Sequence, residues 1–105
     1  MQATVGLQSH EYQAGDIFNE LVGEVKNNGT QPADSVKITA SFYDGNGNIV
    51  GTDFTFTEPL TIAPGDTGTF KMLPGEMEVN NATTYSLRIT NGDESYLVVD
   101  KHPLD

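Results

Sequence analysis

SVKITASFYD, residues 35–44, is the stretch of sequence that decides the fold. Apolar and polar side chains alternate along it with a period of two, so that Val36, Ile38, Ala40 and Phe42 face one way. This pattern is typical of a β-strand that turns one face to a core and the other to solvent. We therefore expect a strand here, with those four side chains in the interior.

Turn sequences lie on both sides of this strand. On its N-terminal side, residues 21–26 alternate and are followed by NNGTQP, residues 27–32, where Gly supplies a positive φ and Pro ends strand pairing. On its C-terminal side, DGNGN, residues 44–48, is typical of a hairpin turn. Residues 49–57 follow, with Val50, Phe54 and Phe56 in alternating register, and we expect them to pair with residues 35–44.

The rest of the chain repeats this rhythm of short strands and turns. Two prolines exclude a central strand within residues 58–66, and residues 67–73 are predicted as a strand with Phe70 and Met72 inward. Residues 84–90 and 95–101 read as a closing hairpin, and a first strand is expected within residues 3–12. Seven short strands predict an all-β, immunoglobulin-like antiparallel β-sandwich, with residues 1–105 as a single domain. A small barrel and a jelly roll are the alternatives.

One tyrosine favours the sandwich over the barrel. Tyr85 stands at the start of the sixth predicted strand, two residues before the inward Leu87. That is the place of a tyrosine corner, in which the hydroxyl bonds to backbone a few residues upstream.

Composition and charge exclude several classes of protein. A chain of 105 residues supports one core and no interdomain cleft, which excludes a large two-domain enzyme. Five basic against 15 acidic residues give a net charge of -10, which disfavours nucleic acid as a partner. The absence of Cys excludes disulfides, a thiolate zinc site and a Cys nucleophile. No apolar run approaches the roughly 18 residues of a membrane span, so we expect no direct membrane insertion.

The order of the segments LVGEVKNNGT (21–30), VKITASFYD (36–44), GNIVG (47–51) and LTIAPG (60–65), followed by Phe70, resembles the FxLYD domain family. The similarity spans residues 20–73, and the pair Tyr43-Asp44 matches the end of the motif that names the family. Related repeat domains of archaeal and bacterial surface proteins share this order of strand segments and of turns that contain glycine and proline. The resemblance implies an immunoglobulin-like, non-catalytic module located in the cell envelope or outside the cell.

The hairpin turn at residues 44–48 is also the best candidate for a cation site. Asp44, Asn46 and Asn48 present oxygen ligands at alternate positions of a glycine-rich loop, the spacing of a calcium loop. The pattern then departs from an EF-hand, because Ile49 and Thr55 replace its Gly and bidentate Glu. A turn whose residues supply positive φ is therefore the favoured interpretation, with weak divalent cation binding as the alternative.

Other polar residues suggest weaker candidates for chemistry. A metal site of His10, His102 and Asp100 is conceivable if the first and last strands are neighbours, although solvated histidines are the favoured interpretation. Aligned tyrosines could stack on sugars, although packing is the expected use of Tyr12, Tyr43 and Tyr96. The acids are expected to form solvated faces rather than a glycosidase pair. They include Glu20, Glu24, Glu76, Glu78, Asp93 and Glu94. Neither a serine elbow nor a phosphate-binding loop is present, so no cofactor is predicted.

Two sequons complete the candidate sites. Asn28 and Asn81 each begin an N-x-[ST] triplet in a predicted surface turn, where N-glycosylation is an option on a secretory route.

These observations favour a non-enzymatic interaction or spacer module of a secreted or cell-envelope protein, whose partner is a protein or a cell-surface component. The alternative is a sandwich module that binds Ca²⁺ or a glycan. An enzyme is the third and least favoured class.

Overall fold

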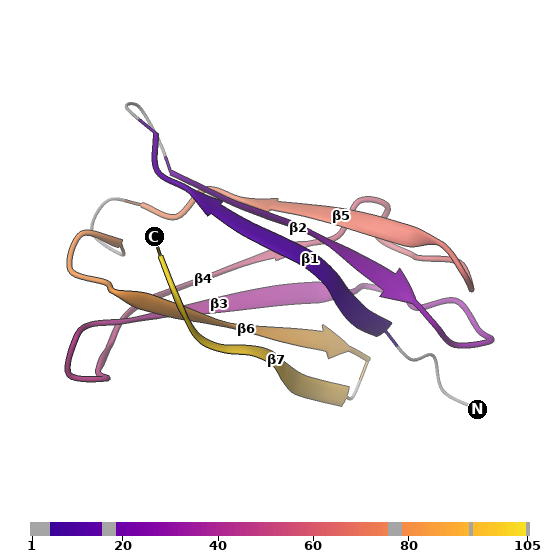
Figure 1. Ribbon diagram of the computed structural model, residues 1–105. Coiled ribbons are helices and arrows are strands. Elements are labelled where there is room, and N and C mark those ends of the chain that lie inside the picture. Colours follow the sequence, from indigo (N-terminus) through magenta and orange to yellow (C-terminus); the bar gives the residue numbers. More distant parts are fainter. Residues whose placement is uncertain (1–4, 16–18, 76–78, 93, 105) are drawn as a thin grey trace.

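The computed structural model describes residues 5–15, 19–75, 79–92 and 94–104, and in these ranges it shows seven strands in two antiparallel sheets. One sheet has the order β1-β2-β5 and the other the order β4-β3-β6-β7, and the two lie face to face (Figure 1). The predicted all-β sandwich of immunoglobulin type is confirmed. The strands are β1 (Val5–Gln13), β2 (Glu20–Asn27), β3 (Lys37–Tyr43), β4 (Ile49–Phe56), β5 (Thr67–Met72), β6 (Thr84–Asn91) and β7 (Glu94–Pro103).

The core lies between the sheets and is built from the alternating positions of the inner strands. Every second residue of β3 is buried, as the sequence predicts, and β5 contributes Phe70 and Met72. The buried apolar side chains are Val5, Leu21, Val25, Ala33, Val36, Ile38, Ala40, Phe42, Ile62, Phe70, Met72, Tyr85, Leu87 and Ile89.

The turn between β3 and β4 forms the predicted hairpin. Gly47 adopts φ 86°, a conformation that favours glycine, and its amide donates to the Asp44 carbonyl at 3.1 Å. The Asp44 amide donates to the Asn48 carbonyl at 2.9 Å, which closes the hairpin.

Strand β4 differs from the expected pattern. Val50 packs against the core, but Phe54 and Phe56 point outward and are about half exposed. A register irregularity between Phe42 and Tyr43 causes this difference between Val50 and the two phenylalanines. Tyr43 pairs with Ile49, whereas Phe42 pairs with Gly51, so that Val50 is an extra residue in the strand. The three apolar residues of this strand therefore do not share one face.

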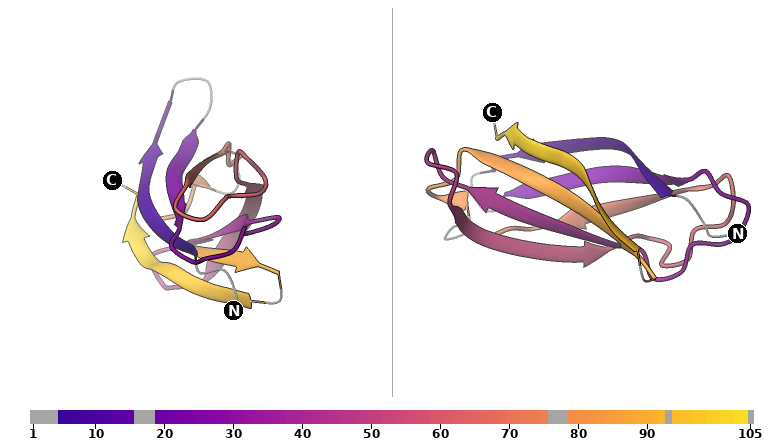
Figure 2. Two further views of the ribbon diagram at one scale, coloured as in Figure 1. Left: turned by 90° about the vertical axis from the view of Figure 1, so that its right-hand side faces the viewer. Right: turned by 90° about the horizontal axis from the view of Figure 1, so that it is seen from below.

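The first and last strands form the edges of the two sheets along one flank of the sandwich, and side chains of both strands meet in the seam between them (Figures 1 and 2). The Tyr96 hydroxyl donates to the Val5 carbonyl near one end of this seam. Near the other end, His10 of β1 lies against Tyr85 and His102. The expected tyrosine corner differs in its partner among the described residues, since the hydroxyl of the buried Tyr85 contacts His10 of β1.

Across the ranges that the structure describes, we find no helix with the length and hydropathy needed to cross a membrane.

Candidate functional site

A cluster of aromatic and imidazole rings, here called the histidine cluster, closes the seam between β1 and β7. It consists of His10, Tyr85 and His102. Nδ1 of His10 and the Tyr85 hydroxyl are 2.7 Å apart, and the two imidazole rings pack edge to face with centroids 4.7 Å apart. A hollow of about 280 Å³ opens beside them, lined also by Glu11 and Tyr12.

A bulge in β7 brings His102 into this cluster. Lys101 adopts φ 49°, and its amide donates to the buried Ser86 hydroxyl at 2.9 Å. The pairing with β6 shifts here, so that His102 stands opposite Tyr85. Bulges bend a strand and redirect its side chains, and this one turns His102 toward His10.

Burial changes the acid–base properties of the cluster. It lowers the pKa of His10, and the neighbouring His102 lowers it further. Burial also raises the pKa of Tyr85 to about 12. The expectation that His10 is a solvated terminal residue is therefore wrong, because its ring is partly buried and bonded.

The structure brings together two of the three groups in the conceivable metal site. His10 and His102 are in contact, whereas the carboxylate of Asp100 lies 3.5 Å from the Ser86 hydroxyl. Within the described ranges, no three His, Cys, Asp or Glu side chains are grouped so that they could hold a metal ion.

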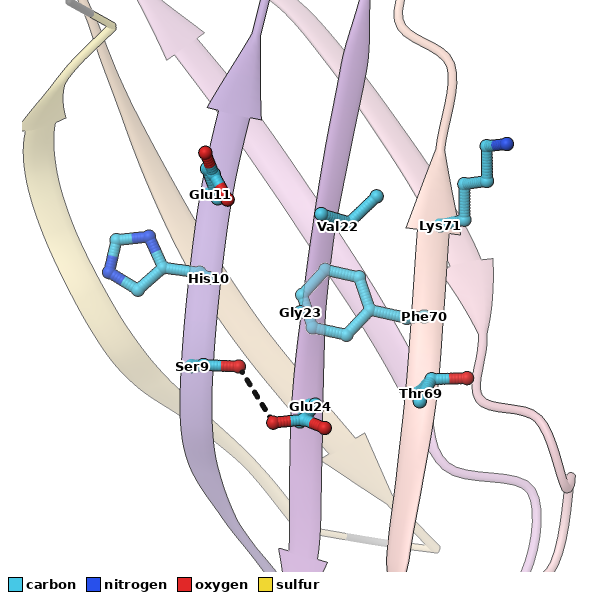
Figure 3. A pocket seen from close by; sticks show the side chains of 9 residues that line it. All are labelled: Ser9, His10, Glu11, Val22, Gly23, Glu24, Thr69, Phe70 and Lys71. Atoms are coloured by element: carbon cyan, nitrogen blue, oxygen red, sulfur yellow. Dashed lines mark hydrogen bonds between the residues drawn. The ribbon is translucent and has the colours of Figure 1, made fainter.

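A second hollow is an open groove of about 440 Å³ across the three-stranded sheet (Figure 3). Ser9 donates to Glu24 at 3.2 Å along its floor, and the ring of Phe70 lies across Gly23. His10 borders the groove but points away from it, toward β7. The groove thus offers hydrogen-bonding groups on an open sheet surface, with the Ser9 hydroxyl engaged by a carboxylate.

The remaining sequence candidates lie in separate places. Tyr12 packs inward beside Tyr85, Tyr96 reaches the Val5 carbonyl, and Tyr43 lies under Lys101, so the tyrosines do not form one stacking face. Glu20 pairs with Lys71 at 2.9 Å. The candidate acids Glu76, Glu78 and Asp93 lie outside the described residues.

The Asp44 carboxylate is engaged by its own turn. Its Oδ1 accepts hydrogen bonds from the amides of Asn46 and Asn48, both at 2.9 Å. These bonds lower the pKa of Asp44, and the bond from the Asn48 amide has the largest effect. The geometry is that of an Asx-type turn, which gives this side chain a structural role in the hairpin.

The two sequons and a neighbouring residue have different environments. Asn28 and Asn81 are exposed, as expected of surface turns. Asn27 is fully buried, which corrects its assignment to the turn. Its Nδ2 donates to the carbonyls of Gln31 and Ile62 at 2.8 and 2.9 Å, and its Oδ1 accepts from the Gly29 amide. Its position in the inward register of β2 was the available signal.

The outer surface of the four-stranded sheet collects exposed apolar side chains, and we call it the aromatic face. Residues that stand opposite each other on adjacent strands project from the same side of the sheet. On this side Phe56 stands opposite Lys37, Phe54 opposite Thr39, and Leu97 opposite Arg88. Its exposed fractions are 49% for Phe54, 48% for Phe56, 47% for Leu97 and 59% for Ile49. The aromatic face consists of Lys37, Tyr43, Ile49, Phe54, Phe56, Arg88, Leu97 and Lys101.

Cations and rings are paired on the aromatic face. The Lys37 ammonium lies 4.4 Å from the centre of the Phe54 ring, and the Lys101 ammonium lies 5.3 Å from that of Tyr43. Both distances are within the range of cation–π attraction. A hollow of about 280 Å³ lies between Lys37, Thr39 and Phe54.

The sandwich is similar in shape to part of several β-glucosidases of known structure. The β-glucosidase DesR from Streptomyces venezuelae, in complex with D-glucose, has a TM-score of 0.55 and 10% identity over 91% of this chain and 15% of that chain. D2-BGL from Chaetomella raphigera has a TM-score of 0.54 and 13% identity, over 92% and 18%. The GH3 β-glucosidase from Bifidobacterium adolescentis has a TM-score of 0.50 and 12% identity, over 95% and 17%.

These similarities show the fold, an immunoglobulin- or fibronectin-III-like sandwich, and the chain spans less than a fifth of each enzyme. No protein-family model and no curated protein matches the sequence. The resemblance to the FxLYD family is therefore not supported beyond the shared type of sandwich.

Proposed function

We propose that this chain works as a non-enzymatic accessory module within a larger secreted or cell-envelope protein. The observation that carries the proposal is the place of the same fold in the three β-glucosidases. There a sandwich similar to more than nine-tenths of this chain makes up 15–18% of a much longer polypeptide. A sandwich of this kind presents surfaces and spaces its neighbours, while other domains carry the chemistry.

The arrangement of polar groups supports a role without catalysis. Ser9 is bonded to Glu24, Glu20 is paired with Lys71, and His10 is bonded to Tyr85. A nucleophile needs a base that is itself oriented by a third group. Ser9 lies in the groove of the three-stranded sheet, whereas the imidazole of the adjacent His10 points away from it toward β7. The location outside the cytoplasm is supported by the exposed sequons Asn28 and Asn81, which are accessible to a glycosyltransferase.

The proposal is tested on the natural polypeptide and on the isolated chain. Antibodies raised against the chain should detect, in fractionated cells of the source organism, a polypeptide much heavier than 11.3 kDa in the secreted or envelope fraction. The isolated chain should leave 4-nitrophenyl β-D-glucopyranoside and other chromogenic glycosides unhydrolysed. A natural polypeptide of 11.3 kDa, or turnover that copurifies with the isolated chain, would refute the accessory role.

A further inference from the structure

We propose that the aromatic face is the surface through which this sandwich docks onto the adjoining domain of the same larger protein. The surface of the adjoining domain that meets the aromatic face is expected to be apolar at its centre and acidic at its rim. This inference rests on the proposed accessory function and adds to it the face that is used and the chemistry of the partner surface.

The first argument is the concentration of exposed apolar side chains. Six large hydrophobic residues of the described chain are well exposed, and four of them belong to the aromatic face. Aromatic and aliphatic side chains that gather on one face mark an interaction surface, whereas isolated exposed ones are ordinary. Aromatic residues and Arg are also the residues enriched in the centres of protein interfaces. Phe54, Phe56, Leu97 and Arg88 fit that composition.

The second argument is charge. The chain has five basic residues, and three of them, Lys37, Arg88 and Lys101, belong to the aromatic face. Two acids lie beside this face, Asp53 in the hollow next to Lys37 and Asp100 next to the Ser86 hydroxyl, and the three cations outnumber them. A basic face on a molecule with a net charge of -10 is complementary to an acidic rim.

A second copy of the chain does not fit this face. Two aromatic faces would bring two sets of the cations Lys37, Arg88 and Lys101 into one interface, and like charges in an interface are unfavourable. On the outer face of the three-stranded sheet, Lys26 and Lys71 offset two of the acids Glu11, Glu20 and Glu24, and this face lacks a matching group of large apolar side chains among the described residues.

A glycan also fits less well than a protein. The rings of Phe54 and Phe56 stand at 72° with centroids 6.2 Å apart, so they do not form one flat platform for sugar rings. Lys37 already lies over the face of Phe54. Ile49 and Leu97 add aliphatic surface, which suits an apolar protein partner.

Hydroxyl-radical footprinting of the natural polypeptide tests the inference. The modification rates of Phe54, Phe56 and Leu97 should fall severalfold from the isolated chain to the natural polypeptide. Leu60 and Leu73 are the internal controls, since they are exposed to a similar extent outside the aromatic face, and their rates should stay the same. Equal rates for the aromatic face in the two proteins would overturn the docking inference. So would protection of the isolated chain that grows with its concentration or that follows addition of cell-wall glycan.

Charge-reversal variants of the natural polypeptide provide the second arm. The double variant Lys37→Glu, Arg88→Glu should return the rates of Phe54 and Phe56 to those of the isolated chain. The matched control Lys26→Glu, on the outer face of the other sheet, should leave the protection intact. Circular dichroism of the isolated variants checks that they fold. If the double variant unfolds, Phe54→Ser replaces it, and the modification rate of Leu97 then reports whether the aromatic face is still protected. A heavy polypeptide with an unprotected aromatic face contradicts only the docking, whereas a natural polypeptide of 11.3 kDa contradicts the accessory role itself.

Discussion

Asn27 ties three segments together from a fully buried position. Its side chain bonds to the backbone of Gly29, Gln31 and Ile62, and its own amide and carbonyl bond to Asp66 and Gly65. The end of β2, the loop that follows it and the loop before β5 are thus held by one residue. A buried polar group is tolerated in a core when it is satisfied in this way.

Replacing Asn27 by Ala should be costly, whereas the same change at Asn28 should not be. Asn27→Ala leaves the carbonyls of Gln31 and Ile62 without a donor in the interior, and we expect a loss of about 3 kcal/mol in the free energy of unfolding. Asn28 is exposed, so Asn28→Ala should change it by less than about 0.5 kcal/mol. Urea unfolding of both variants measures the difference. Similar midpoints for the two variants would show that the network around Asn27 contributes little.

His10 makes the stability of the fold depend on pH. The pKa of His10 lies below its ordinary value of 6.5, mainly through burial and further through His102, so the unfolded chain binds its proton more readily. The stability that the fold gains from holding His10 in its neutral form is therefore complete above about pH 6.5, and it is lost as the pH falls through the lowered pKa of His10. Of the groups around the His10 ring, Glu11 could stabilise the imidazolium, whereas His102 opposes it and Tyr12 and Tyr85 stay neutral.

The variant His10→Gln should remove this dependence. We expect the urea midpoint of the unaltered chain to fall between about pH 7.5 and about pH 5.5 more steeply than that of His10→Gln. His102→Gln, which removes the second charge but leaves His10 buried, should give an intermediate slope. Identical slopes for all three proteins would assign the pH dependence to other groups.

The Asp44 turn should be indifferent to calcium. Its Oδ1 already accepts two backbone amides, so a cation would have to compete with these bonds. We expect millimolar Ca²⁺ to leave the melting temperature unchanged and Asp44→Ala to lower it slightly. Isothermal calorimetry gives the direct check, and micromolar binding that Asp44→Ala abolishes would establish the loop as a cation site.

Single residues were predicted well where their role is local and poorly where it depends on distant chain. The inward set of β3 and the turn chemistry of Asp44 and Gly47 follow from neighbouring residues alone. The partners of Asn27 and His10 come from strands far away in the sequence, and sequence periodicity carries no information about them. The structure therefore changes the interpretation of these two residues most.

At the scale of elements, one bulge decides which side of β4 is exposed. A regular ladder continued from the pair Tyr43 and Ile49 would place Phe54 opposite Ile38, in the core. The extra residue at Val50 shifts the register by one, so Phe54 stands opposite Thr39, outside. A one-residue shift moves every later side chain to the other face. The strand was predictable from its alternation, but the exposure of the aromatic face was not, because alternation does not reveal a bulge.

The contact between β2 and β5 depends on a glycine. A Cβ on Gly23 would lie 2.3 Å from the Ser9 carbonyl oxygen and 2.5 Å from the Phe70 ring. Gly23→Ala must therefore displace backbone as well as a buried ring, and we expect a loss of at least about 2 kcal/mol. Gly45→Ala, where nothing lies within 4 Å of the added atom, is the matched control and should be nearly neutral. Thermal unfolding compares them, and equal melting temperatures would mean that β2 has room to move.

For the whole molecule, the class of fold follows from many weak signals that agree. Seven alternating segments separated by turn residues left few architectures open, and the observed sandwich is the favoured one. The functional surfaces needed more than this. The histidine cluster forms only where β1 meets β7, and the aromatic face combines side chains from four strands, so both depend on the assembled sheets.

The placement of the first and last strands has a mechanical consequence. β1 starts and β7 finishes at opposite ends of a body 41 Å long, and both run along that length (Figures 1 and 2). Tension applied through the polypeptide would pull β1 along β2 and β7 along β6, while the ladder bonds stand across the direction of force. The bonds of a ladder must then yield together instead of opening one after another. In single-molecule stretching, we expect a rupture force well above that of the same domain pulled through residues 84 and 103, which stand opposite each other at one end of the β6–β7 ladder and so open its bonds one after another. Within a longer polypeptide that is held at both ends, such a sandwich would bear load.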